Sequence, residues 1–354
     1  MPRFILNINY KFYIKNRRIY INRLLALAWR KRVLIGVILI LILLYHIIAP
    51  DVWFLHTGPW EDVSCHYLPE KHAYYEPVLP IKSIFYLETS CRGDLAIRQA
   101  CSVESAARSL PNWQINVFFV APMSPAVIMK LLAQRYTNVK PKRINIVELA
   151  KGTPLEALVV GGALNRTRWR ISHTSDVLRY LTLYKWSGIY LDMDMVVAKN
   201  FDDLTNNFAS KISNSNVEAG VMSFSSDRTG RRIAKAAIRD MRRNFRGDTW
   251  GHNGPGVITR VLRSFCDTND IAMMDIDTCN GFIVYEPEVF YPISWEQRTE
   301  YFEPSKREIG SSYGYHIWAS FTNHLSVDKS SFYSRVAKEF CPIIYNNYRE
   351  EFGY

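Results

Sequence analysis

The pattern of hydrophobic and polar positions divides the chain into three parts. Residues 33–49 (VLIGVILILILLYHIIA) form an apolar run of 17 residues without a charged side chain. Residues 50–78 show little periodicity and contain several prolines. From residue 79 onward, apolar positions recur with the spacing of strands and then of helices, in turn. The pattern predicts a membrane-spanning helix over 33–49, a stem over 50–78 and a folded domain over 79–354.

Strands and helices are expected to alternate in the folded part. We expect strands at residues 81–87, 115–120, 144–149 and 189–191, and helices at residues 95–110, 125–136 and 173–186. Such alternation favours an α/β fold with a mainly parallel sheet around one large core. In sheets of this kind, ligands bind at the carboxyl ends of the strands.

The apolar run is better explained as a signal anchor than as a cleaved signal peptide. As a helix it spans roughly 25 Å, slightly less than a hydrocarbon core of about 30 Å, which a thinner early-secretory membrane tolerates. Arg30, Lys31 and Arg32 flank one end, and Trp53 and Phe54 can lie at the opposite interface. The basic segment before the run is about thirty residues long, and no small-x-small cleavage pattern follows it.

The charge distribution predicts the orientation of this anchor. Residues 1–32 contain nine basic residues and no acidic one, and the first acidic residue is Asp51. By the positive-inside rule, residues 1–32 form a cytoplasmic tail and the domain is lumenal. Removing those nine from the 44 basic residues leaves 35 against 33 acidic ones, a remainder of about +2. The net charge of +11 is therefore weak support for a nucleic-acid partner.

All six cysteines follow the anchor, which favours disulfides in an oxidising lumen. Six cysteines allow 15 pairings. Cys91 with Cys101 and Cys266 with Cys279 are close in sequence, but spacing proves neither pair. No CxxC or clustered Cys/His metal spacing occurs, and Asn165 lies in a glycosylation sequon.

Two carboxylates follow the expected strand at residues 189–191. Asp192 and Asp194 are one residue apart, so in extended chain they point to the same side and can bind one hard cation. Such a cation can hold a diphosphate, which in a lumenal enzyme suggests sugar transfer from a nucleotide sugar. Asp176 and Arg179 share a face of the preceding helix. They are either a surface ion pair or, because the strand is short, neighbours of the aspartates.

Several segments together resemble a known family. Residues 175–194 (SDVLRYLTLYKWSGIYLDMD) resemble the DXD sugar-binding region of the alpha-1,4-glycosyltransferases, and residues 251–260 (GHNGPGVITR) resemble their C-terminal signature. Residues 85–90 with 101–108, and 290–295 (FYPISW), also fit. The resemblance covers residues 79–345. Ser187 departs from it, because the family usually has glycine there, and we expect this to tune only the turn.

The resemblance implies a single GT-A (Rossmann-like) domain, a UDP-sugar donor, Mn²⁺ and retention of anomeric configuration. It gives catalytic roles to Asp192, Asp194 and Asn253. It places donor contacts at Asp176, Arg179, Tyr190 and His252, and metal contacts at Asp192, Asp194 and His316. For His316, a structural role beside Trp318 is equally compatible with the sequence. No carboxylate pair stands out as nucleophile and acid, which suits a front-face mechanism.

Other interpretations of the paired aspartates are weaker. A haloacid-dehalogenase-type phosphatase uses a similar strand end with Asp192 as nucleophile, but there the strand normally opens its domain. A non-catalytic carbohydrate-binding protein would tolerate loss of either aspartate, and both are present. Asp275 and Asp277 match the same minimal pattern in a variable-looking loop, so we expect them at the surface.

The expected function is α1,4 transfer of Gal or GalNAc from UDP-Gal or UDP-GalNAc to a terminal sugar of a glycosphingolipid at the Golgi membrane. The alternative is GlcNAc transfer to glycoprotein glycans. The sequence does not decide the donor sugar, because a single residue in an N-acetyl pocket can change it.

Overall fold

The computed structural model describes residues 29–38, 40–41, 61, 63–68 and 77–352. The chain divides into two units, Met1–Pro59 and Trp60–Tyr354. In the first unit residues 29–38 and 40–41 are helical, and the rest of the predicted tail, anchor and early stem lies outside the described residues. Within the described ranges, no helix has both the length and the apolar character needed to cross a membrane.

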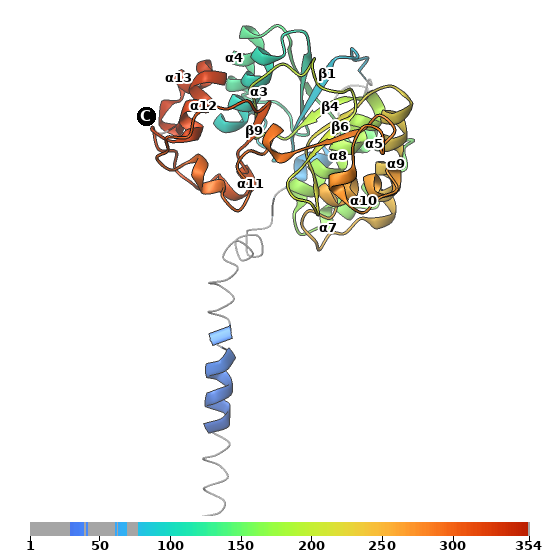
Figure 1. Cartoon of the computed structure of the whole chain (residues 1–354), viewed down its shortest axis with the longest axis vertical. Coiled ribbons are helices and arrows are strands. Elements are labelled where there is room, and N and C mark those ends of the chain that lie inside the picture. Colours follow the sequence, from blue (N-terminus) through green and yellow to red (C-terminus); the bar gives the residue numbers. More distant parts are fainter. Residues whose placement is uncertain (1–28, 39, 42–60, 62, 69–76, 353–354) are drawn as a thin grey trace, which may run out of the picture. The chain divides into compact units, whose positions relative to one another are not determined.

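The second unit is organised around a central sheet (Figure 1). In the part of the chain that the structure describes, this sheet has seven strands in the order β3-β2-β1-β4-β7-β6-β8. The strands β3, β2, β1 and β4 are parallel, β7 is antiparallel to both β4 and β6, and β8 is parallel to β6. Their bounds are β1 Ser83–Glu88, β2 Gln114–Phe119, β3 Val139–Arg143, β4 Gly188–Leu191, β6 Phe208–Lys211, β7 Val217–Phe224 and β8 Ile283–Tyr285. The predicted α/β fold is confirmed.

Helices cover both faces of this sheet and enclose two hydrophobic cores (Figure 1). Strand β1 separates the cores: Ile84 and Tyr86 point into one, and Phe85 and Leu87 into the other, because side chains alternate along a strand. The first core is covered by α3 (Ile97–Ser109), α4 (Val127–Arg135), α12 (Phe332–Phe340) and α13 (Pro342–Asn347). The second is covered by α5 (Ile146–Ala150), α6 (Glu156–Val160), α7 (Ala163–Arg166), α8 (Arg170–Trp186), α9 (Arg228–Asn244) and α10 (Pro255–Phe265).

The prediction of a strand at residues 144–149 was wrong. The third strand is β3, and helix α5 follows it. Strand β3 is at the sheet edge and only its first residue, Val139, is buried, so its sequence lacks the apolar alternation of an inner strand. The side chain of Asn145 accepts hydrogen bonds from the N–H groups of Val147 and Glu148, and this N-cap starts the helix.

The second unit contains three disulfides, Cys65–Cys91, Cys101–Cys341 and Cys266–Cys279, and the second of them joins residues 240 positions apart. Sequence proximity suggested two pairs. Cys266–Cys279 is present, whereas Cys91 is bonded to Cys65 and not to Cys101. Cys101 lies on the buried face of α3, which packs against the C-terminal helices α12 and α13. Cys65 belongs to a 3₁₀ turn, Ser64–Tyr67, so this described portion of the predicted stem is bonded to the folded unit.

The connection from α8 to β4 has an unusual backbone conformation. Ser187 has φ 57° and ψ −177°, a region that is populated almost only by glycine. Gly188 has φ 109°, and a Cβ there would lie 2.5 Å from the backbone oxygen of Ser83 on β1. The strand that carries the aspartates therefore leaves the helix through two residues with positive φ, and Ser187 does more than tune the turn.

We predict that Ser187→Gly stabilises the protein by about 1 kcal/mol, because glycine relieves strain worth roughly 1–3 kcal/mol while making the unfolded chain more flexible. Urea unfolding of the two proteins measures the difference. Ser226→Gly is the control: this exposed serine has no positive φ, so glycine there should leave stability unchanged or lower it. A Ser187→Gly protein less stable than wild type would contradict the strain.

Candidate active site

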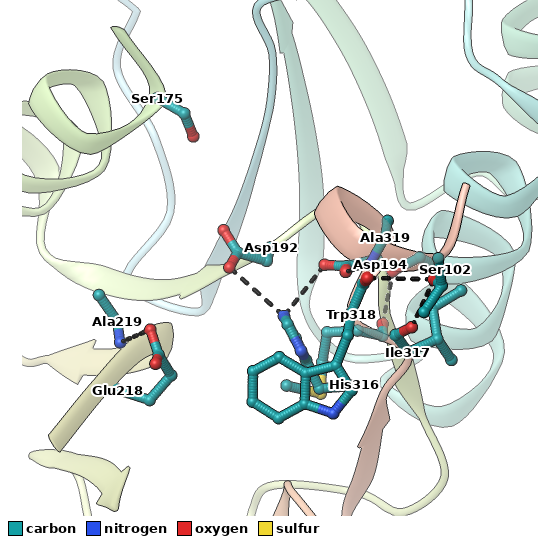
Figure 2. A network of polar contacts seen from close by, with 12 residues as sticks. Ser102, Ser175, Asp192, Asp194, Glu218, Ala219, His316, Ile317, Trp318 and Ala319 are labelled. Carbon is teal, nitrogen blue, oxygen red and sulfur yellow. Dashed lines mark hydrogen bonds and ion pairs between the residues drawn. The ribbon is translucent and has the colours of Figure 1, made fainter. Parts of the chain in front are cut away.

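Asp192 and Asp194 lie at the carboxyl end of β4, in the turn that leads to the short strand β5 (Met195–Val197). The N–H of Asp192 donates to the backbone oxygen of Gly220, which ties the turn to β7 (2.8 Å). Strand β5 pairs antiparallel with β9 (Gly314–His316), and Met195 is directly opposite His316. This pairing brings His316 from far along the chain to the two aspartates (Figure 2).

The three side chains form a compact set of ligand atoms. Nε2 of His316 is 3.1 Å from Oδ1 of Asp194 and 3.5 Å from Oδ2 of Asp192. Oδ2 of Asp194 accepts the N–H of Ala319, the first residue of helix α11 (Ala319–Thr322), at 2.6 Å. One oxygen of Asp194 is thus held in place, while the other faces His316 and Asp192.

The set fits a divalent cation. Its carboxylate and imidazole atoms lie within 4.8 Å of one another. His316 is buried, and neither ring nitrogen has a partner with hydrogen-bond geometry among the residues described. A buried imidazole directed between two carboxylates is suited to ligation of a metal such as Mn²⁺. The other candidate group in the described chain, Cys65, His66 and Cys91, has both thiols in a disulfide.

The electrostatics of the set favour charged groups. Burial opposes ionisation of Asp192, but Arg179, His316 and Tyr190 outweigh it and lower the pKa of Asp192 to about 2. Burial also opposes a charge on His316, but the two carboxylates raise the pKa of its imidazole to about 10. The shifts in both directions have one cause, the close approach of the carboxylates to Arg179 and His316.

Arg179 links the aspartates to helix α8. Its Nη2 is 3.1 Å from Oδ1 of Asp176 and 3.3 Å from Oδ1 of Asp192. Nη1 donates to the backbone oxygen of Ala219 at 3.0 Å, and the guanidinium lies 4.7 Å from the ring centre of Tyr190. Tyr190 in turn donates its hydroxyl to Oδ1 of Asp192 (2.5 Å). The i,i+3 pair is buried beside the aspartates, so it is not a surface ion pair.

Asp176 lies against the start of helix α10. A Cβ on Gly254 would come within 2.5 Å of Oδ1 of Asp176, so only glycine fits there without a shift. The hydroxyl of Tyr180 donates to the backbone oxygen of Gly254 at 2.6 Å. Burial raises the pKa of Asp176 to about 7, against the opposing effect of Arg179. This carboxyl can therefore donate or accept a hydrogen bond near neutral pH.

Asn253 and His252 lie in the loop before α10, where their side chains bond to backbone groups. The Asn253 amide accepts from the N–H of Arg246 (2.9 Å) and donates to the oxygen of the same residue (2.6 Å). Nε2 of His252 is 2.9 Å from the backbone oxygen of Asn244. In this structure both side chains stabilise the loop, and Gly254 is the residue of this segment that reaches Asp176. Their catalytic and donor-binding roles stay predictions.

Sequence reasoning missed three residues around the aspartates. Gly220 and Glu218 occupy alternate positions on β7, and a Cβ on Gly220 would lie 2.9 Å from Asp192 Oδ2. Glu218 lies across from Asp192 (Figure 2). Burial raises the pKa of Glu218, and its charge interacts with Asp192, Arg179 and His316. The buried hydroxyl of Tyr291 has no hydrogen-bond partner in the described structure. For Glu218 and Gly220 the only local signal was their i,i+2 spacing on β7, and for Tyr291 it was its place in the family-like segment 290–295.

We predict that Gly220→Ala lowers the affinity for a divalent cation, with Mn²⁺ as the probe, at least tenfold, equivalent to about 1.4 kcal/mol. The added methyl would lie 2.9 Å from Asp192 Oδ2, 3.1 Å from Tyr291 Oη and 3.2 Å from His316 Nε2, so the ligand atoms must move apart. Titration calorimetry measures the affinity. Gly310→Ala is the matched control, because a Cβ there meets nothing within 4 Å. Equal affinities in the two variants would argue against this arrangement of ligands.

Two family models match the chain. "Glycosyltransferase sugar-binding region containing DXD motif" covers residues 97–211, and "Alpha 1,4-glycosyltransferase conserved region" covers residues 226–348. Among solved structures, the PaToxG glycosyltransferase has a TM-score of 0.40 at 18% identity, covering 57% of this chain and 74% of that one. The galactosyltransferase LgtC with donor and acceptor sugar analogues has a TM-score of 0.39 at 13% identity, covering 73% and 96%. TM-scores this low support no conclusion about the fold beyond the sheet order described above.

Curated relatives are more similar in sequence. Lactosylceramide 4-alpha-galactosyltransferase of Rattus norvegicus is 31% identical over 272 residues, which cover 73% of this chain and 74% of the relative. The Homo sapiens protein of the same name is 32% identical over 252 residues (67% and 68%). Alpha-1,4-N-acetylglucosaminyltransferase of Homo sapiens is 26% identical over 257 residues (69% and 72%). The chain therefore belongs to the alpha-1,4-glycosyltransferase family and contains the DXD sugar-binding region of that family.

Proposed function

We propose that this glycosyltransferase moves Gal or GalNAc from a UDP-sugar, with retention and in α1,4 linkage, to a terminal sugar of a glycosphingolipid. The observation that carries the proposal is the set of Asp192, Asp194 and His316 beside the buried Asp176–Arg179 pair. Relatives at about 31% identity that are named for galactose transfer to lactosylceramide support the choice of donor and acceptor. In this proposal the domain is of the GT-A class.

Asp192, Asp194 and His316 would hold Mn²⁺. The position of the His316 imidazole between the two carboxylates, with Nε2 3.1 Å from Oδ1 of Asp194, supports this assignment. When bound, the ion supplies positive charge to the diphosphate as it leaves. Asp194 contributes a pre-oriented ligand because the N–H of Ala319 fixes its other oxygen. Asp192 contacts either the ion or the donor ribose.

Asp176 and Arg179 would hold hydroxyls of the transferring sugar. Both side chains are buried and pre-positioned, so binding costs little side-chain entropy. Tyr190 positions Asp192 through its hydroxyl and supports the Arg179 guanidinium with its ring face. In a front-face mechanism the acceptor hydroxyl attacks on the side of the departing phosphate and gives up its proton to it. The buried cluster then orients the sugar and excludes water.

Transfer of GlcNAc to glycoprotein glycans is a second candidate. A human alpha-1,4-N-acetylglucosaminyltransferase covers 69% of the chain at 26% identity, which supports GlcNAc as a donor within this family. The higher identity of the galactose-named relatives favours Gal or GalNAc. An N-acetyl group needs a pocket beside the 2-position of the sugar. Turnover with UDP-GlcNAc compared with turnover with UDP-Gal and UDP-GalNAc therefore distinguishes these candidates.

We further propose a Golgi location with type II topology and a lumenal catalytic unit. The apolar run at 33–49 and the nine basic residues before it support the anchor and its orientation. The three disulfides support an oxidising compartment. An anchored transferase is also held close to lipid-linked acceptors.

We predict that wild-type protein forms an α1,4-linked product from lactosylceramide and UDP-Gal or UDP-GalNAc with Mn²⁺, and that Asp194→Asn lowers turnover at least about a hundredfold, because the variant loses charge at the metal ligand. The full chain in detergent is incubated with each of three donors, UDP-Gal, UDP-GalNAc and UDP-GlcNAc. Released UDP is quantified, and nuclear magnetic resonance identifies the linkage. Circular dichroism checks that the variant is folded.

Asp277→Asn is the matched control, because Asp277 belongs to the other Asp-x-Asp pair and is exposed. It should retain wild-type turnover. Full activity of Asp194→Asn would refute the metal assignment, and a wild-type enzyme inert with glycolipids but active on glycoprotein glycans would favour the GlcNAc candidate. A phosphorylated Asp192 in a protein without transferase activity would instead indicate a phosphatase.

A further inference from the structure

Three aromatic side chains meet at one place in the second unit: Trp250, Trp295 and Phe321. The ring centres of Trp295 and Phe321 are 6.0 Å apart, and those of Trp250 and Phe321 are 6.4 Å apart. Trp295 is 37% exposed, more than any other tryptophan that the structure describes beyond residue 60, and the other two are partly buried. We call these three residues the aromatic cluster. Large aromatic surfaces normally lie in the core, so a partly exposed group is unusual.

The cluster bridges the two sides of the candidate active site. Phe321 is two residues beyond Ala319, whose N–H bonds to Asp194. Trp250 is four residues before Gly254, which lies against Asp176. Two extended residues span at most about 7 Å and four at most about 14 Å. The backbone of Phe321 therefore lies within about 7 Å of Ala319, and that of Trp250 within about 14 Å of Gly254. The contact between Trp250 and Phe321 thus joins the segment that carries Ala319 to the segment that carries Gly254.

The chemistry of the cluster suits a sugar. A pyranose ring has one face of C–H groups, and the negative face of an aromatic ring attracts such groups while excluding water. Arg298 lies 5.6 Å from the ring centre of Trp295 and 5.5 Å from that of Phe321. The guanidinium thus packs over both rings, and its Nη1 donates to the backbone oxygen of Trp295 (2.8 Å). Its remaining N–H groups are of the kind that donate to sugar hydroxyls. Aromatic surface next to a guanidinium donor matches a neutral glycan.

We propose that the aromatic cluster is the acceptor subsite, on which the terminal sugar of the acceptor glycan stacks beside the donor. The inference rests on the proposed function, because it assumes a donor sugar at Asp176, Arg179 and the metal ligands. Trp250 precedes Gly254, which contacts Asp176, and Phe321 follows Ala319, which bonds to Asp194. An acceptor sugar held on the cluster therefore lies next to the transferring sugar. The donor itself is bound by other residues.

The test compares Trp295→Leu, which removes the ring, with Trp295→Phe, which keeps one. The full chain is assayed in detergent with lactosylceramide and with soluble lactose as acceptors. We expect Trp295→Leu to raise the KM for both acceptors at least tenfold and Trp295→Phe to raise it less than about threefold. UDP-sugar hydrolysis without acceptor and the affinity for UDP with Mn²⁺ should stay at wild-type values. Phe321→Leu serves as a second variant should Trp295→Leu fail to fold.

Trp113→Leu is the control, because Trp113 is a partly buried tryptophan that bonds to Asp202 (3.0 Å) instead. An unchanged acceptor KM in Trp295→Leu and Phe321→Leu, or an equal fall in hydrolysis and transfer, would overturn the subsite. Calorimetric binding of lactose to the UDP–Mn²⁺ complex tests the cluster even without turnover. A wild-type protein that binds lactose through Trp295 but transfers nothing would refute only the proposed function.

Discussion

The buried charge of Arg179 is the interaction on which the site depends. Its guanidinium contacts Asp176 and Asp192, bonds to the backbone of β7 and lies over the ring of Tyr190. Helix α8 and strands β4 and β7 therefore meet at one cation. Without it, the buried Asp176 would lose its ion-pair partner, and Asp192 would keep only His316 and Tyr190. Removing one member of a buried ion pair typically costs several kcal/mol. The same charge keeps Asp192 ionised, so the structural and electrostatic roles of Arg179 cannot be separated.

A second constraint is the pairing of two three-residue strands, β5 and β9. It places His316 opposite Met195 and hence beside Asp194, and it positions the following helix α11 so that Ala319 bonds to the same carboxylate. The disulfide between Cys101 and Cys341 holds the C-terminal helices against α3 on this side of the sheet. The C-terminal segment thus completes a site whose first residues lie in the middle of the chain.

The fold was predictable where burial and periodicity agree. The inner strands β1, β2 and β4 are mostly apolar because they are buried on both faces, and helices α3 and α4 carry apolar residues at helical spacing. The edge strand β3 was missed because most of its residues are partly exposed or exposed, and a cap at Asn145 turned the next apolar run into helix. The conformation of Ser187 was also missed, because positive φ in a residue other than glycine has no sequence signal.

The sequence by itself determined the parts of the site whose spacing is local. Asp176 and Arg179 share a face because a helix repeats every 3.6 residues. Asp192 and Asp194 are neighbours in sequence, but they lie in a turn closed by the hydrogen bond from Met195 N–H to Asp192 O (3.0 Å), and not in the extended chain that their spacing predicted. Only the tertiary structure brought these pairs to His316, placed Glu218 within electrostatic range of them and gathered the aromatic cluster from three separate segments. Such contacts depend on which strands pair and which helices share a core, and local periodicity does not encode that choice.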